Sequence, residues 1–66
     1  MNRIEAMKVA YQHIIYLEAF DRLVQRQICD APDEFTRDWL SETRQVVQND
    51  LFAFQQVYNK LKGTNQ

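Results

Sequence analysis

The sequence predicts an all-α fold, an antiparallel hairpin of two long helices. Apolar residues recur in steps of three and four on both sides of Pro32, which is the only proline. This spacing keeps one stripe of a helix turned toward a partner helix. The only glycine is Gly63, close to the end of the chain, so long regular elements are favoured over loops.

The first helix is expected over about residues 2–29. Its ladder of stripe positions consists of Met7, Ala10, Ile14, Leu17, Asp21, Val24 and Ile28. Residues 9–17 are apolar nearly all the way round the helix, and Tyr11 and Ile15 fall outside the ladder. A helix that is apolar on two sides needs two partners. A second copy of the hairpin would supply the other partner, so we expect a homodimeric four-helix bundle.

The second helix is expected over about residues 33–62, after a short link at residues 30–32 that turns the chain back. Asp30 and Asp33 are both candidates for its N-cap. The ladder of this helix consists of Leu40, Thr43, Val47, Asp50, Phe54, Val57 and Leu61. A break near residues 41–43 is the alternative, and it would give a three-helix bundle.

The 66 residues predict one small domain over residues 1–66, with a frayed tail at residues 63–66. At this size a single core rarely supplies more than about 3–5 kcal/mol without a disulfide, a metal or a partner chain. Cys29 is the only cysteine, which excludes an internal disulfide and a cysteine-based metal cage. Association with another chain is the source of stability that remains.

The charge and the start of the chain indicate a cytoplasmic protein. The net charge of −1 gives little attraction toward nucleic acid or an anionic membrane. The first eight residues carry charges where a signal peptide needs an apolar stretch. No apolar run approaches the roughly 18 residues of a membrane span. We therefore expect neither membrane nor nucleic acid to be the main partner.

Six residues are expected in the core or the dimer interface: Met7, Ile14, Leu17, Val47, Leu51 and Phe54. Asp21 and Asp50 occupy ladder positions, although an ionised carboxylate is costly to bury unless it is paired. Folding about the link sets residue i roughly opposite residue 65 − i. Asp21 then lies near Arg44, and Asp50 lies near Tyr11, His13 and Tyr16.

We interpret Asp21, Arg44, Asp50 and His13 as a polar core layer that sets the helix register. The alternative is that one aspartate is exposed and contacts a basic side chain of a partner. His13 beside Asp50 would also suit a general base. However, no nucleophile, oxyanion loop or pocket glycine accompanies the pair. We therefore expect no enzyme activity, no catalytic residues, no cofactor and no metal site.

The function that the sequence favours is a small protein-binding regulator or adaptor that works as a homodimer. It would block or bridge a larger protein, as an inhibitor, an anti-activator or a chaperone-like factor. We expect the partner surface around Tyr11, Ile15 and Phe52, because exposed aromatic residues anchor interfaces. The alternative is a dimeric RNA- or DNA-binding regulator that uses Arg22 and Arg26, which lie one turn apart on the first helix.

Overall fold

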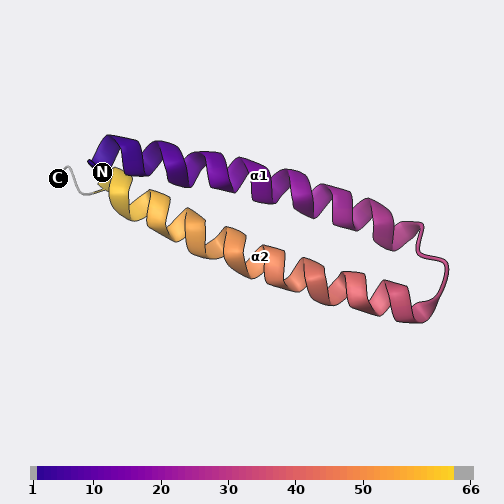
Figure 1. Ribbon diagram of the computed structural model, residues 1–66. Helices are drawn as coiled ribbons and strands as arrows, with labels where there is room; N and C mark the ends of the chain where they lie inside the picture. The colour runs from indigo at the N-terminus through magenta and orange to yellow at the C-terminus, as the bar shows by residue number, and fades with distance from the viewer. Residues whose placement is uncertain (1, 64–66) are drawn as a thin grey trace.

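The computed structural model describes residues 2–63, which form two antiparallel helices joined by a short turn (Figure 1). Helix α1 spans Arg3–Cys29 and helix α2 spans Glu34–Gly63. The two helices lie side by side and form a rod of 50 × 16 × 14 Å. The predicted helical hairpin is confirmed. Because α2 runs unbroken through residues 41–43, the three-helix alternative is wrong.

Helix α1 begins one residue later than predicted, because Asn2 serves as its N-cap. The side-chain oxygen of Asn2 accepts a hydrogen bond of 2.8 Å from the backbone N–H of Glu5. This bond satisfies one of the free N–H groups at the start of the helix. The carboxylate of Glu5 lies in the first turn, where the helix dipole favours a negative charge.

The turn between the helices gives Asp30 and Asp33 different tasks. The backbone N–H of Asp30 donates to the carbonyl of Arg26 at 3.3 Å and so closes α1. Asp33 is the N-cap of α2, and its Oδ1 accepts from the backbone N–H of Thr36 at 2.7 Å. Pro32 stands just before this cap, where its missing N–H removes no helical hydrogen bond.

The far end of α2 extends slightly beyond the prediction, because Gly63 is still helical. Lys60 and Lys62 lie in this last turn, where the helix dipole favours positive charge. The rest of the predicted frayed tail, residues 64–66, lies outside the described residues, as does Met1.

The ladder predicted for α1 packs against α2 over its whole length. All seven of its residues are buried or half-buried, and Ala10, Ile14 and Val24 are the most enclosed. Asp21 is among the half-buried members, although it carries a charge. The spacing would also admit Tyr11 in place of Ala10 and Phe20 in place of Asp21, but both of these residues are exposed and the predicted members lie in the seam.

The ladder predicted for α2 is wrong at two positions. Asp50 and Val57 are exposed, and Leu51 and Tyr58 take their places in the seam between the helices. Both routes leave Val47 in steps of three and four, so the spacing does not choose between them. Burial of the Leu51 side chain in place of the Asp50 carboxylate leaves the charge in water, which decides the rotation of the helix.

The core of the hairpin is small. Five side chains are buried within the described residues, and all are aliphatic: Ala10, Ile14, Val24, Leu40 and Val47. The Cα radius of gyration is 15.1 Å, whereas a compact chain of this length has a radius of about 11 Å. The single seam therefore leaves most of the large apolar side chains outside it.

Candidate interaction surfaces

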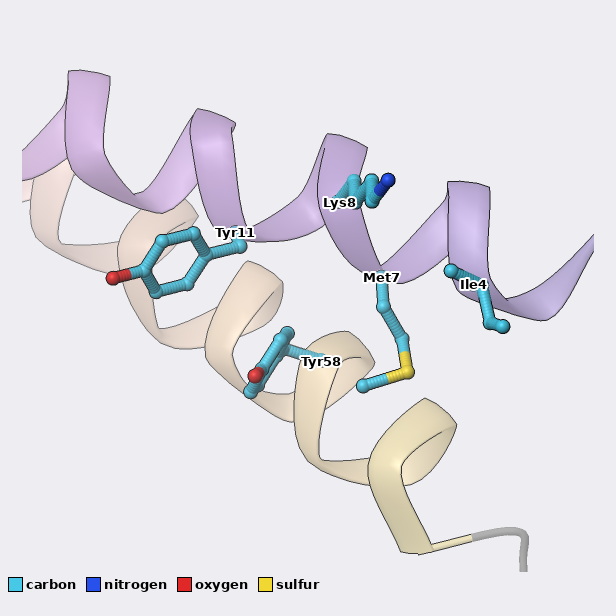
Figure 2. Close-up of a pocket in the computed structure, with 5 residues that line it drawn as sticks. All are labelled: Ile4, Met7, Lys8, Tyr11 and Tyr58. Atoms are coloured by element: carbon cyan, nitrogen blue, oxygen red, sulfur yellow. The ribbon is translucent and has the colours of Figure 1, made fainter.

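One edge of the seam is formed by Tyr11 of α1 and Tyr58 of α2, whose ring centroids lie 5.9 Å apart. Figure 2 shows the two rings on facing helices, with Met7 reaching from α1 toward α2 beside Tyr58. Together with Ile4 and Lys8 they line an open depression of about 280 Å³. We call these five residues the tyrosine edge. It is an apolar depression with one ammonium group at its rim.

The structure brings together two of the three residues predicted to bind a partner. Tyr11 and Ile15 line one further open depression on the outer surface of α1, which continues from the tyrosine edge. Phe52 does not join them. It lies about 200° round α2 from Phe54, which faces α1, and so points away from the other helix. Its side chain is 63% exposed, so it forms a separate site on the back of α2.

The opposite edge of the seam carries two further rows of residues in steps of three and four. The row on α1 consists of Val9, His13, Tyr16, Phe20 and Leu23. The row on α2 consists of Trp39, Thr43, Val46, Asp50, Ala53 and Val57. We call these two rows the apolar face.

Both rows lie on the same broad side of the hairpin. Each runs along the side of its helix that is turned away from the contact between Tyr11 and Tyr58. The imidazole of His13 marks this second edge, because it packs on the ring of Phe54 with centroids 4.1 Å apart. The two edges of the seam are therefore covered by different kinds of side chain.

The apolar face carries a single ionised side chain, the carboxylate of Asp50. Its large apolar members are all between two fifths and two thirds exposed: Val9, Tyr16, Phe20, Leu23, Trp39, Val46 and Val57. The side of the hairpin that holds the tyrosine edge carries many more charges than the apolar face does: Lys8, Glu18, Arg22, Arg37, Arg44 and Lys62. Such a contiguous exposed apolar surface indicates a site of interaction with another molecule.

Half of the predicted polar core layer is present. Arg44 donates from Nε to Oδ1 of Asp21 at 3.1 Å, and the exposed fractions of their side chains are 35% and 15%. The amide of Gln25 donates to Oδ2 of Asp21 at 3.2 Å. Both carboxylate oxygens are thus satisfied, as a half-buried charge requires.

The other half of that layer is not formed within the hairpin, where His13 and Asp50 are both exposed. Asp50 leaves the seam when Leu51 enters it, and His13 packs on Phe54. The described residues include no hydrogen bond or ion pair between His13 and Asp50. The candidate general-base pair is therefore not assembled in the hairpin.

Arg22 and Arg26 are both exposed on the outer surface of α1. With Ala19 and Leu23 they line an open depression one turn long. Within residues 2–63 neither guanidinium group takes part in an ion pair or a side-chain hydrogen bond. Two unpaired positive charges are therefore presented together on this side of α1.

The apolar face was not predicted, although the signal for its α1 row is present in the sequence. The row from Val9 to Leu23 has the same stepping as the seam ladder beside it, and the two together make this helix apolar over a wide arc. The predicted partner surface includes Tyr11 and Ile15, which lie on the opposite side of α1 from the apolar face. The rotation of α2, which brings Val46 and Val57 onto the same face, depends on the contacts with α1.

The described residues hold no cluster of three or more His, Cys, Asp or Glu side chains that could bind a metal ion, and the Cys29 thiol is exposed. Neither helix, over the part of the chain that the structure describes, contains a stretch long and apolar enough to cross a membrane. No protein-family model matches the chain, and no curated protein or solved structure matches it.

Proposed function

We propose that this chain is a small non-enzymatic, cytoplasmic protein-binding regulator or adaptor that acts as a homodimer. It blocks or bridges a larger protein, as an inhibitor, an anti-activator or a chaperone-like factor. The observation that carries the proposal is the exposure of twelve large apolar side chains on one short hairpin. Seven of them lie together on the apolar face, and a contiguous exposed apolar surface of this kind is typical of interaction sites.

The two edges of the seam support two different contacts. The apolar face is long and almost free of charge, which suits a contact with a second copy of the chain. The tyrosine edge and Ile15 present aromatic and aliphatic anchors beside the ammonium of Lys8, and aromatic residues and Met are enriched in sites that bind a separate partner. A dimer that forms through the apolar face leaves the tyrosine edge of each copy free to bind a larger protein.

Affinity purification with matched variants tests the proposal. Tyr11→Lys introduces a charge into the tyrosine edge, and Gln56→Lys introduces the same charge at an exposed position of α2 away from it. We expect a larger protein to copurify with the wild type and with Gln56→Lys, and to be lost with Tyr11→Lys. Circular dichroism checks that both variants remain helical. Equal recovery with both variants would contradict the assignment of this surface.

A second candidate function is an RNA- or DNA-binding regulator, favoured by the exposed, unpaired Arg22 and Arg26. Dimerisation would double this pair and extend the basic surface. Against it stands the net charge of −1, which gives the chain little overall attraction to phosphate. The salt dependence of binding separates this function from the first.

A further inference from the structure

We propose that a second copy of this chain packs on the apolar face, with the two turns at opposite ends of a four-helix bundle. The inference rests on the homodimer of the proposed function and adds to it the surface, the orientation and the facing residues. Three independent observations lead to a second copy as the occupant: the accessible area, the composition of the face, and the distribution of charge along the rod.

The accessible surface of the hairpin is too large for a compact chain of its mass. It measures 5293 Å² for 7.9 kDa, whereas a folded monomer of this mass exposes about 4,400 Å². The excess of about 900 Å² is close to the roughly 800 Å² that each partner buries in an interface of ordinary size. One face-to-face contact with a copy of similar dimensions would remove an area of this size.

The apolar face repeats the packing pattern of the seam. Its rows step by three and four along both helices, so a second hairpin laid on it would continue the side-chain packing that already joins α1 and α2. Asp50 is the one ionised residue in these rows. In a contact between two copies, each ionised residue of the face is buried twice. Because this face has only one such residue, the free-energy cost of desolvating charge stays low.

The two ends of the rod carry opposite charge. Around the turn, over residues 26–42, five acids outnumber the two bases Arg26 and Arg37: Asp30, Asp33, Glu34, Asp38 and Glu42. At the open end, where α1 begins and α2 finishes (Figure 1), bases outnumber Glu5: Arg3, Lys8, Lys60 and Lys62. A copy with its turn at the opposite end sets each acidic turn beside a basic open end. Turns at the same end would bring the acidic groups together.

This orientation places the two-fold axis near the middle of α1, which is Tyr16. Tyr16 then faces the same residue of the second copy, Val9 faces Leu23, and His13 faces Phe20. Asp50 stands roughly level with Tyr16 along the hairpin, so the Tyr16 hydroxyl is a donor available to it at the centre of the bundle. Gln12 donates to that hydroxyl oxygen at 3.4 Å, which leaves its proton free.

Light scattering coupled to size exclusion, over a concentration series, tests the face. Phe20 and Ile15 form a matched pair on α1, because they are 44% and 46% exposed on opposite sides of the helix. We expect a wild-type mass of twice 7.9 kDa and a dimer dissociation constant raised by about 100-fold or more in Phe20→Lys. Ile15→Lys should leave the dimer intact. A monomeric wild type, or dissociation by Ile15→Lys alone, overturns the inference.

A distance measurement on the wild-type sequence tests the orientation and does not depend on a variant that folds. Cys29 is the only cysteine and is exposed, so a spin label can be attached there. With turns at opposite ends, the two labelled sites lie about 40 Å apart, from the helical rise over α1. A separation under about 20 Å would place the turns together and overturn the proposed arrangement.

Failure of this inference is distinguishable from failure of the partner-binding function. A monomer that still loses its larger partner on Tyr11→Lys substitution contradicts the dimer and leaves protein binding in place. A dimer with the predicted distance between labels that binds no larger protein contradicts the partner-binding function and supports the proposed dimer.

Discussion

Arg44 of α2 reaches across the seam and donates to Asp21 of α1 at 3.1 Å. This ion pair fills a ladder position that would otherwise hold an apolar side chain. Aliphatic seam contacts tolerate a helix that slides by one turn, because another aliphatic residue replaces the first. A charge pair does not, since a slip would leave the Asp21 carboxylate facing apolar groups. The pair therefore selects one register of the hairpin.

Removal of Arg44 is expected to destabilise the hairpin through the partner that it leaves behind. Arg44→Leu leaves the Asp21 carboxylate, whose side chain is 15% exposed, without its cation. We expect a loss of about 1–3 kcal/mol in the free energy of unfolding. Urea denaturation followed by circular dichroism at one fixed protein concentration measures it. Arg37→Leu, at an exposed position, is the control and should change stability by less than about 0.5 kcal/mol.

The double variant Asp21→Leu and Arg44→Leu tests whether the loss of stability comes from the unpaired Asp21 carboxylate. Because two leucines in the seam avoid the cost of desolvating charges, we expect it to recover most or all of the loss. If Arg44→Leu alone is as stable as the wild type, the ion pair has no part in holding the helices together.

Asp50 is expected to weaken self-association, because it is the only ionised group on the apolar face. Asp50→Leu removes this charge and extends the apolar row, so the dimer should tighten by about 10-fold. Sedimentation equilibrium over a range of concentrations measures the change. Asn49→Leu adds the same side chain one residue away, off the face, and should leave the dissociation constant unaltered. An equal gain in both variants would indicate a general effect of hydrophobicity.

The fold could be predicted from the sequence because its signals are local and repeated. The α1 ladder and the turn at Pro32 each agree with the hairpin, and the pairing of Asp21 with Arg44 follows from the position of the turn. The rotation of α2 could not be predicted in the same way. Asp50 and Leu51 both fit a spacing of three or four from Val47, so the spacing does not choose between them, whereas the cost of burying the Asp50 carboxylate does. The α2 row of the apolar face was not predicted, because its position depends on that rotation.

Acid is expected to weaken the start of α2 through Asp33. The backbone N–H of Thr36 donates to the Asp33 carboxylate, and this bond is the main cause of the lowered pKa of Asp33. The side chain of Thr36 also donates to the carboxylate and lowers the pKa further. A lowered pKa in the folded state means that the stabilisation is complete above the unfolded pKa of about 3.9. It is lost as the pH falls through the lower, folded value.

Thermal unfolding of the wild type and of Asp33→Asn between pH 7 and pH 2 measures this linkage. The asparagine keeps a capping oxygen and cannot ionise. We expect the wild type to lose melting temperature in the most acidic part of the range, and the variant to lose less there. Asp38→Asn is the control for a charge change near the same helix end. Parallel curves for the wild type and Asp33→Asn would show that ionisation of the cap does not affect folding.

Binding to nucleic acid is expected to be weak, because the two exposed arginines belong to a chain with a net charge of −1. Fluorescence anisotropy with a labelled RNA duplex and a DNA duplex, at salt from 50 to 200 mM, decides the question. If Arg22 and Arg26 do contact phosphates, affinity falls steeply with salt, and Arg22→Ala reduces the slope by about one unit. Lys62→Ala, at the open end of the rod, is the matched control for a lost charge. We expect no saturable binding in this range, because two arginines in each copy release few counterions.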